Sequence, residues 1–297
     1  MPKPKVIAIV GPTASGKTSL SIKLAQHLGG EVISADSRQV YRELDIGTGK
    51  VTAKEMAGVP HHLLDVTAME EIYTGVNFKR DAETAIVDIK ERGKTPIIAG
   101  GTFFYLDLLR GKMQAAPVTP NPKYRDSLAT YSNEELLELL QQKDSRRANN
   151  IEPFNRRRLV RALEIIHTLG SVPEQVETES PYNLLILGIE VEKEVLREKF
   201  AKRLAGWLEE GLVEEVTMVR KRLSRERFLE LGFEYTITAE YIDQQITKDE
   251  LVEKFVQKNW QYAKRQMTWL KRDDAVQWIN PKDIKMILGK VNDFLAE

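Results

Sequence analysis

The stretch from residue 11 to residue 18 has the residue types and the spacing of a phosphate-binding loop. It fits the pattern G-x-x-x-x-G-K-[ST], and it stands between an apolar run at 6–10 and a helix-like segment at 19–28. In that order of strand, loop and helix, backbone N–H groups converge on phosphate oxygens at the positive end of a helix. The predicted phosphate ligands are Gly11, Pro12, Thr13, Ala14, Ser15, Gly16, Lys17 and Thr18.

Two side chains of this loop add chemistry of their own. Lys17 supplies a mobile cation, and the hydroxyl of Thr18 is a ligand for Mg²⁺. The pattern therefore predicts a polyphosphate site with a magnesium ion, for which a nucleotide such as ATP is the first candidate. The alternative is a glycine-rich turn that holds a lysine by chance.

Asp36 and Thr102 are the next candidates, because each follows a short apolar run that is typical of a buried strand. Asp36 fits a general base that accepts a proton from a nucleophile near the phosphates. It fits equally well a carboxylate that orders magnesium-bound water or caps the next turn. Thr102 fits a hydrogen-bonding group near the same ligand, although from position alone a helix N-cap is the stronger interpretation.

Three basic clusters stand out in a chain whose charges otherwise balance. They are residues 156–158 with Arg161, residues 220–222 with Arg225 and Arg227, and residues 264–265 with 271–272. Each cluster alone is typical of a solvated helix face. Three of them also fit a track for a polyanion such as RNA, and both interpretations stay open at this point.

The elements that must position these residues alternate along the chain. Apolar β-type runs at 6–10, 31–36, 95–99 and 184–189 are separated by helix-like segments, and a last edge strand is predicted at 275–279. This alternation indicates an α/β fold with a doubly wound parallel sheet. Ligands of such sheets bind at the carboxyl ends of the strands, so we expect the phosphate loop, Asp36 and Thr102 to share one rim.

The pattern changes between residues 113 and 152. Pro117, Pro120 and Pro122 mark a linker, and a polar helix is predicted at 133–142. We therefore predict a small helical insertion at 113–152 within a P-loop core formed by residues 1–112 and 153–297. Two later amphipathic helices, at 154–168 and 249–270, are assigned to that core.

The composition excludes several classes of protein. The 297 residues include 44 Lys and Arg against 44 Asp and Glu, so any nucleic-acid site must be a local patch. The absence of Cys excludes disulfides and thiolate metal sites, and His61 and His62 lack further ligands at zinc-binding spacing. No signal peptide or membrane span is evident, so we expect a cytoplasmic protein with no membrane partner.

Taken together, the motifs resemble the bacterial tRNA dimethylallyltransferase (tRNA isopentenyltransferase) family. The matching stretches run in the family's order and span most of the chain. They are residues 11–18, Ser-Ala-Asp-Ser-Arg-Gln-Val-Tyr-Arg at 34–42, Asp-Ile-Gly-Thr at 45–48, Gly-Val-Pro-His-His-Leu at 58–63, Gly-Gly-Thr at 100–102, Arg-Ala-Leu-Glu at 161–164 and Ala-Lys-Arg-Gln-Met-Thr-Trp at 263–269.

This resemblance implies a reaction. A dimethylallyl group moves from dimethylallyl diphosphate to N6 of the adenosine 3′ of the anticodon in tRNA, and diphosphate leaves. The loop at 11–18 then holds that diphosphate instead of ATP, with Lys17 and a Mg²⁺ ion on Thr18 stabilising the leaving charge. The resemblance assigns proton abstraction to Asp36, positioning of the adenosine to Thr102, and a clamp on the diphosphate to Arg203.

The resemblance also implies a set of contacts with the anticodon stem-loop of tRNA. The residues are Asp36, Ser37, Arg38, Gln39, Thr102, Arg125, Arg157, Arg158, Arg161, Lys264 and Arg265. The chain departs from the family pattern at several places. Phe154-Asn155 stand where Asn-Asp is usual, Phe103-Phe104 stand where Gly-Leu is usual, and residues 231–235 match Gly-Tyr-Lys-Glu only loosely.

Three other functions remain to be weighed. The phosphate loop alone fits a small-molecule or nucleotide kinase, and an adenylate isopentenyltransferase would prenylate free adenylate. An RNA-binding module with a degenerate site is the third. The basic clusters argue against the first two, and the intact Lys17, Thr18 and Asp36 argue against the last. A monomer is the expected state.

Overall fold

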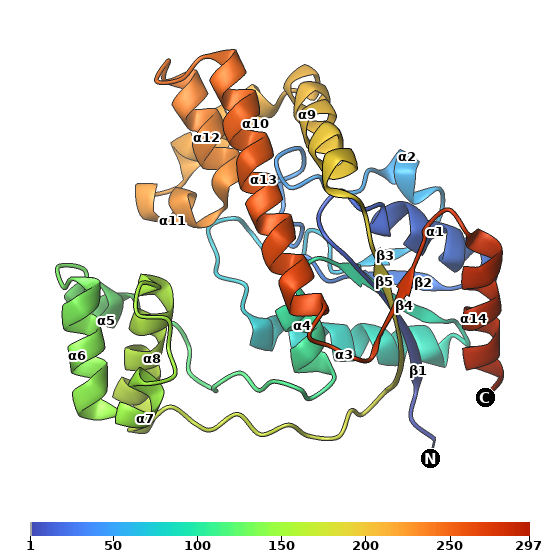
Figure 1. The fold of residues 1–297 in the computed structure, drawn as a ribbon, viewed down its shortest axis with the longest axis horizontal. Coiled ribbons are helices and arrows are strands. Elements are labelled where there is room, and N and C mark those ends of the chain that lie inside the picture. Colours follow the sequence, from blue (N-terminus) through green and yellow to red (C-terminus); the bar gives the residue numbers. More distant parts are fainter. Residues whose placement is uncertain (1) are drawn as a thin grey trace. The chain divides into compact units, whose positions relative to one another are not determined.

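The computed structural model describes residues 2–297, which form two compact units. The core unit comprises residues 2–111 and 179–297, and the insertion unit comprises Lys112–Thr178 (Figure 1). The insertion predicted at 113–152 lies within the second unit, but the unit extends further, to Thr178. The reason is that helix α8 (Arg156–Leu169) buries its apolar face against the other helices of the insertion.

The core unit is built on a six-stranded sheet in which every pairing is parallel, with the order β3-β2-β4-β1-β5-β6 (Figure 1). The strands are β1 (Lys5–Val10), β2 (Glu31–Ser34), β3 (His61–His62), β4 (Pro96–Gly100), β5 (Asn183–Ile189) and β6 (Val276–Ile279). The doubly wound α/β class is therefore confirmed, with β6 at one edge as predicted. The two-residue strand β3 at the other edge was not predicted.

Helices cover both faces of this sheet. Along β1 the side chains alternate, so that Val6 and Ala8 join one apolar cluster while Ile7 and Ile9 join the other. Helices α3 and α4 complete the first cluster, and α1 and α14 complete the second. These helices are α1 (Lys17–Leu28), α3 (Gly75–Glu91), α4 (Phe103–Leu109) and α14 (Ile284–Ala296).

A third apolar cluster lies among five consecutive helices and the segment that follows β2. It buries Phe200, Tyr235 and Phe255 together with Val40 and Leu44. The helices are α9 (Lys193–Glu210), α10 (Leu212–Arg222), α11 (Arg225–Glu230), α12 (Phe233–Ile242) and α13 (Lys248–Leu270); the short α2 (Ala53–Met56) precedes β3. In the described part of the chain, no helix has the length and apolarity needed to cross a bilayer.

The insertion unit has a small core of its own. Helices α5 (Pro122–Ser127), α6 (Asn133–Lys143), α7 (Ser145–Ala148) and α8 enclose residues such as Leu136, Leu140 and Leu163. The segments that enter and leave the unit are joined by hydrogen bonds. The N–H of Gln114 donates to Gln175 Oε1 at 3.0 Å, and Gln175 Nε2 donates to Gln114 O at 3.2 Å.

Candidate active site

The phosphate loop connects β1 to α1 and is ready to accept an anion. Gly16 has a φ of 96° and Ala14 a φ of 61°, so the loop holds a non-glycine residue in the left-handed region, which is strained. The N–H groups of Gly16 and Lys17 have no acceptor in the described part of the chain. Ser15 Oγ is also buried without a hydrogen-bond partner there. Such groups are the donors that an anion at a helix start would satisfy.

The amine of Lys17 folds back over its own loop. Its Nζ donates to Gly11 O at 3.0 Å and to Pro12 O at 2.7 Å. Burial lowers the pKa of Lys17 to about 8; the nearby Asp36 acts in the opposite direction, and Arg203 adds to the lowering. A charged amine in this place gains by the approach of an anion, because the anion offsets the cost of burial.

Arg203 from α9 reaches the same loop. Its Nη1 lies 3.2 Å from Thr13 Oγ1, and its guanidinium lies 5.6 Å from the centre of the Trp207 ring. Burial lowers the pKa of Arg203, against the opposing effects of Glu234 and Asp36. The structure therefore brings together Lys17 and Arg203, two cations that are distant in sequence, and their binding of diphosphate stays a prediction.

Asp36 and Thr102 meet at the carboxyl ends of β2 and β4. The N–H of Ser37 donates to Thr102 Oγ1 at 3.1 Å, and the N–H of Thr102 donates to Ala35 O at 3.1 Å. This approach requires Gly100, because a Cβ there would lie 2.1 Å from Ala35 O. The expectation that both side chains share one rim of the sheet with the phosphate loop is thus confirmed.

Thr102 does not cap the helix that follows it, and Asp36 caps the next turn with only one of its two oxygens. Thr102 stands at the N-cap position of α4, but its hydroxyl makes no capping bond and faces Ser37 instead. Asp36 accepts the N–H of Arg38 at 2.8 Å through Oδ1, and its Oδ2 has no donor among the described residues. One oxygen of Asp36 therefore fixes the turn while the other remains open for chemistry.

Gln266 of α13 ties the phosphate loop to the Thr102 turn. Its Oε1 accepts the N–H of Thr13 at 2.8 Å, and its Nε2 donates to Gly101 O at 2.9 Å. The side chain is buried, and a Cβ on Gly101 would lie 2.5 Å from Nε2. One amide thus links the phosphate loop to the turn that carries Thr102.

Glu234 of α12 is a second carboxyl group near Asp36. Burial raises the pKa of Glu234 to about 7; Arg38 acts to lower it, and Asp36 acts to raise it further. Burial, Asp36 and Glu234 also raise the pKa of Tyr262 well above its usual value. Asp36 therefore lies near groups of both charge signs. The cations are Lys17, Arg38 and Arg203, and Glu234 is the other carboxyl group.

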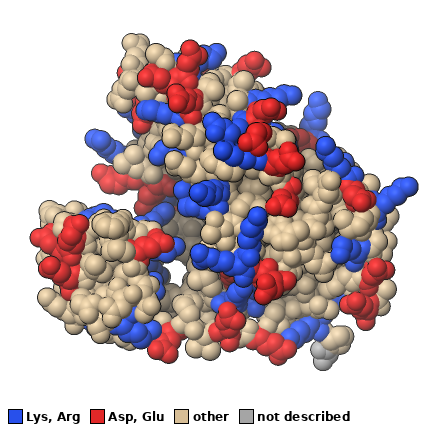
Figure 2. Space-filling view, viewed as in Figure 1, with Lys and Arg blue, Asp and Glu red and all other residues tan. Residues whose placement is uncertain are grey.

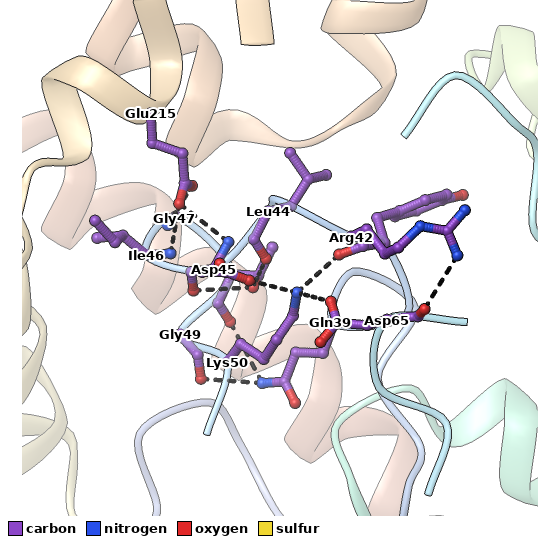
Figure 3. Close-up of polar contacts among 12 residues, drawn as sticks. Gln39, Arg42, Leu44, Asp45, Ile46, Gly47, Gly49, Lys50, Asp65 and Glu215 are labelled. Carbon is purple, nitrogen blue, oxygen red and sulfur yellow. Dashed lines mark hydrogen bonds and ion pairs between the residues drawn. The ribbon is translucent and has the colours of Figure 1, made fainter. Parts of the chain in front are cut away.

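The loop after Tyr41 is held by its own set of ion pairs and hydrogen bonds (Figure 3). Lys50 Nζ donates to Tyr41 O at 2.8 Å and pairs with Asp45 and Asp65 at 2.6 and 2.5 Å. Gln39 Nε2 donates to Gly49 O at 3.1 Å. The amide of Gln39 is therefore engaged by this loop, and its role as an RNA contact stays a prediction.

Comparison of the sequence with known proteins shows the family to which the chain belongs. A family model described as IPP transferase matches residues 39–273. A tRNA dimethylallyltransferase from Halalkalibacterium halodurans is 38% identical, over 99% of this chain and 97% of its own. Another, from Citrifermentans bemidjiense, is 39% identical over 99% and 98%. The chain belongs to the IPP transferase family.

Solved structures of this family have the same fold. A full-length tRNA isopentenylpyrophosphate transferase from Bacillus halodurans superposes with a TM-score of 0.72 at 36% identity, covering 99% of this chain and 96% of that one. A eukaryotic dimethylallyltransferase described as acting on tRNA gives a TM-score of 0.83 at 29% identity, covering 99% and 80%. Both units of the present chain therefore fall within the family's architecture.

The insertion unit uses two of the predicted RNA-binding arginines for its own packing. Glu164 is fully buried in α8, and it accepts Nε of Arg125 at 2.8 Å and Nη2 at 3.0 Å. Arg161 also pairs with Glu164 and donates to Val118 O at 2.7 Å. A buried carboxylate requires such partners, so Arg125 and Arg161 have a structural role, and their contact with RNA stays a prediction.

The other basic residues differ in how far they are already neutralised. In the cluster at 220–227, Arg220 pairs with Asp243 at 2.6 Å and Arg222 with Glu70 at 2.8 Å. On α13, Lys264 and Arg265 are exposed, and the Arg265 guanidinium lies 5.8 Å from the Tyr262 ring centre. Figure 2 shows both signs of charge interspersed over the visible face, in keeping with the balanced composition. Of these two basic clusters, the one on α13 is therefore the less neutralised.

Three residues of this site were not assigned a role from the sequence. Gln266 stood in a matching motif, yet nothing in its pattern indicated two backbone partners. Glu234 lay in the segment that matches the family only loosely. Glu215 accepts the N–H groups of Asp45, Ile46 and Gly47, which places that loop (Figure 3). Its partners are distant in sequence, so no local signal could reveal it.

Proposed function

We propose that this protein transfers a dimethylallyl group from dimethylallyl diphosphate to N6 of the adenosine 3′ of the anticodon in tRNA, with release of diphosphate. The observation that carries the proposal is the single Gln266 side chain that links a phosphate loop to the Asp36–Thr102 pair. We assign the donor site to that loop and the acceptor site to that pair, at one edge of the sheet, in a chain of the IPP transferase family.

The diphosphate would occupy the loop at residues 11–18. The unsatisfied N–H groups of Gly16 and Lys17 and the orphaned Ser15 hydroxyl fit its oxygens, and the cations of Lys17 and Arg203 fit its charge. These donors stabilise the negative charge that develops as the allylic C–O bond breaks.

Magnesium fits the same loop. The exposed Thr18 at the start of α1 offers a hydroxyl oxygen, and Mg²⁺ commonly takes one or two protein oxygens together with phosphate and water. No group of three or more potential His, Cys, Asp or Glu ligands lies in residues 2–297. We assign the remaining ligands of the ion to substrate and water oxygens. When bound, the ion would neutralise part of the charge on the leaving diphosphate.

Asp36 and Thr102 would act on the acceptor. As the new N6–C bond forms, the amine must lose a proton, and the open Oδ2 of Asp36 is the group that we assign to accept it. Thr102, fixed by Ser37, would position the base. The adenosine must leave its stack to reach this edge, at a cost of about a few kcal/mol, which is smaller for a loop base than for a paired one.

The relatives named above favour tRNA as the acceptor over the alternatives. They are called tRNA dimethylallyltransferases, whereas a kinase or an adenylate isopentenyltransferase would act on small molecules. The exposed Lys264 and Arg265 on the Gln266-bearing helix are suitably charged for an RNA backbone. The oligomeric state that we propose is a monomer.

The test is purified protein with labelled dimethylallyl diphosphate, Mg²⁺ and unmodified tRNA in which adenosine follows the anticodon. We expect the label in tRNA, on N6 of that adenosine. A matched tRNA with guanosine in that place is the control and should remain unlabelled. Transfer to free AMP alone, or turnover of ATP without prenyl transfer, would contradict the proposal.

A further inference from the structure

Phe154 is the most exposed large apolar side chain of the described residues. Its exposed fraction is 83%, and it stands directly before α8 of the insertion unit. A single exposed apolar residue needs no special explanation. Phe154 differs from that ordinary case in two respects, which are the rigidity of its backbone and the charge of its neighbours.

The backbone around Phe154 is fixed to the ends of two other helices. Asn133 Nδ2, at the start of α6, donates to Phe154 O at 3.4 Å. The Arg156 guanidinium donates to the carbonyl oxygens of Leu128, Ala129 and Tyr131 at 2.5 to 2.9 Å, just beyond α5. The backbone that carries the ring is thus anchored to the neighbouring segments on both sides.

The nearest charged residues along the chain are mainly cationic. Arg157 and Arg158 are exposed in the first turn of α8. Arg158 Nη1 lies 3.2 Å from Glu152 Oε1, whereas the side chain of Arg157 makes no hydrogen bond or ion pair within the part of the chain that the structure describes. Because Arg125 and Arg161 are held by Glu164, Arg157 is the predicted RNA contact on α8 whose charge is least committed.

We propose that Phe154 is a stacking platform for an unpaired base of bound RNA, with Arg157 contacting a neighbouring phosphate. This inference rests on the proposed function, which supplies a tRNA as the substrate. Single-stranded RNA offers unstacked bases, and proteins bind them by combining an exposed aromatic ring with cations that follow the backbone.

The surroundings of the ring favour RNA over a protein partner. Large contiguous apolar patches mark protein interfaces. Phe154 is instead followed by Asn155, Arg157 and Arg158, and Glu152 stands two residues before it. One aromatic face within polar and cationic side chains suits a planar base.

The experiment measures binding of the full-length protein to an unmodified anticodon stem-loop RNA over a series of salt concentrations. Phe154→Ala should weaken affinity by about 5- to 150-fold, the range for loss of one stacked base, without changing the slope of log affinity against log salt. Phe154→Trp should retain affinity, and Phe154→Leu should not. Arg157→Ala should weaken binding and reduce the magnitude of the slope by about 0.7, the value for one phosphate of a single strand.

Leu169→Ala is the matched control, because Leu169 is an exposed apolar residue at the opposite end of α8. It should bind RNA like the unsubstituted protein. Equal affinity of Phe154→Ala and the unsubstituted protein would overturn the inference, and so would full affinity of Phe154→Leu. A self-association in sedimentation that Phe154→Ala abolishes would assign the ring to a second copy of the chain and overturn it too.

The two proposals fail in different ways. If the unsubstituted protein prenylates the stem-loop but Phe154→Ala binds it equally well, only the stacking platform is refuted. If the unsubstituted protein neither binds nor prenylates the stem-loop, the proposed function fails and the platform fails with it.

Discussion

The phosphate loop and the arginine-rich helix α8 make opposite use of the same kind of interaction. In the loop, N–H groups and the Ser15 hydroxyl are left without partners, and the cations of Lys17 and Arg203 gather beside them. In the insertion unit, Arg161 of α8 and Arg125 both form ion pairs with the buried Glu164. The donors and cations of the phosphate loop can therefore bind a ligand. Much of the charge at α8 instead stabilises the insertion unit.

This difference shows why a cluster of arginines is weaker evidence for a binding site than a phosphate loop. The loop's function lies in backbone geometry, which the glycines and the following helix prescribe locally. An arginine is available to RNA only if it does not already form an ion pair with a carboxylate of the folded chain. The two regions should therefore respond differently to substitution.

The largest effect should come from removing the open carboxylate at the core site. Asp36→Asn keeps the turn that Oδ1 forms with the Arg38 N–H but eliminates the base, so the transfer rate should fall by about 10²- to 10⁴-fold. Single-turnover transfer to tRNA measures the rate, and tRNA binding should survive as the control. An unchanged rate would give Asp36 a structural role.

Glu164→Gln should break the insertion unit while sparing the core. The substitution leaves two arginines without their counter-charge and should cost about 3 kcal/mol, the lower end for buried pairs, because both arginines are about one-third exposed. Hydrogen exchange should show faster opening of α8 with no change in β1. Glu152→Gln, which removes an exposed pair with Arg158, should cost less than about 1 kcal/mol. Equal exchange in both variants would contradict the structural role of Glu164.

Gln266→Met should weaken the donor side of the site by roughly tenfold. Methionine has a similar length but cannot accept the Thr13 N–H, and an unsatisfied buried group costs about 1–3 kcal/mol. Calorimetry with diphosphate and Mg²⁺ measures the loss. Gln261→Met, on an exposed position of the same helix, should have no effect. If both variants bind diphosphate normally, Gln266 does not set the loop.

The pH dependence of diphosphate binding gives the smallest effect. Burial lowers the pKa of Lys17 to about 8, so the free protein carries this charge below pH 8 and loses it as the pH rises. Bound diphosphate favours the charged amine, so affinity should decline above pH 8 by at most about tenfold per pH unit. Lys17→Met should bind weakly at every pH and lose this decline. A decline that persists in Lys17→Met would point to another group.

The sequence was sufficient for those parts of the fold that local patterns determine. The apolar runs before the phosphate loop and Thr102 predicted β1 and β4, and their carboxyl ends meet as expected. Strand β3 was missed because it consists only of His61 and His62, which carry no β-type alternation. The helix α8 was assigned to the core because an apolar stripe does not tell which neighbour it packs against.

The candidate site could be predicted only as far as its parts are contiguous. Residues 11–18 and Asp36 could be assigned from short motifs, whereas the bond between Gln266 and Thr13 joins residues at opposite ends of the chain. The pairing of Arg125 with Glu164 is likewise non-local. It gives a structural role to Arg125, which the motif had assigned to RNA binding. Long-range partners of this kind follow from the fold and not from spacing.

The reciprocal hydrogen bonds between Gln114 and Gln175 make the insertion a replaceable module. They bring the outgoing and returning segments side by side, so that a short turn could join them without stretching either one. Nature or an engineer could then shorten, lengthen or exchange everything between these two glutamines while the parallel sheet kept its connectivity. The insertion and the parallel sheet could in this way change in length and sequence independently within one polypeptide.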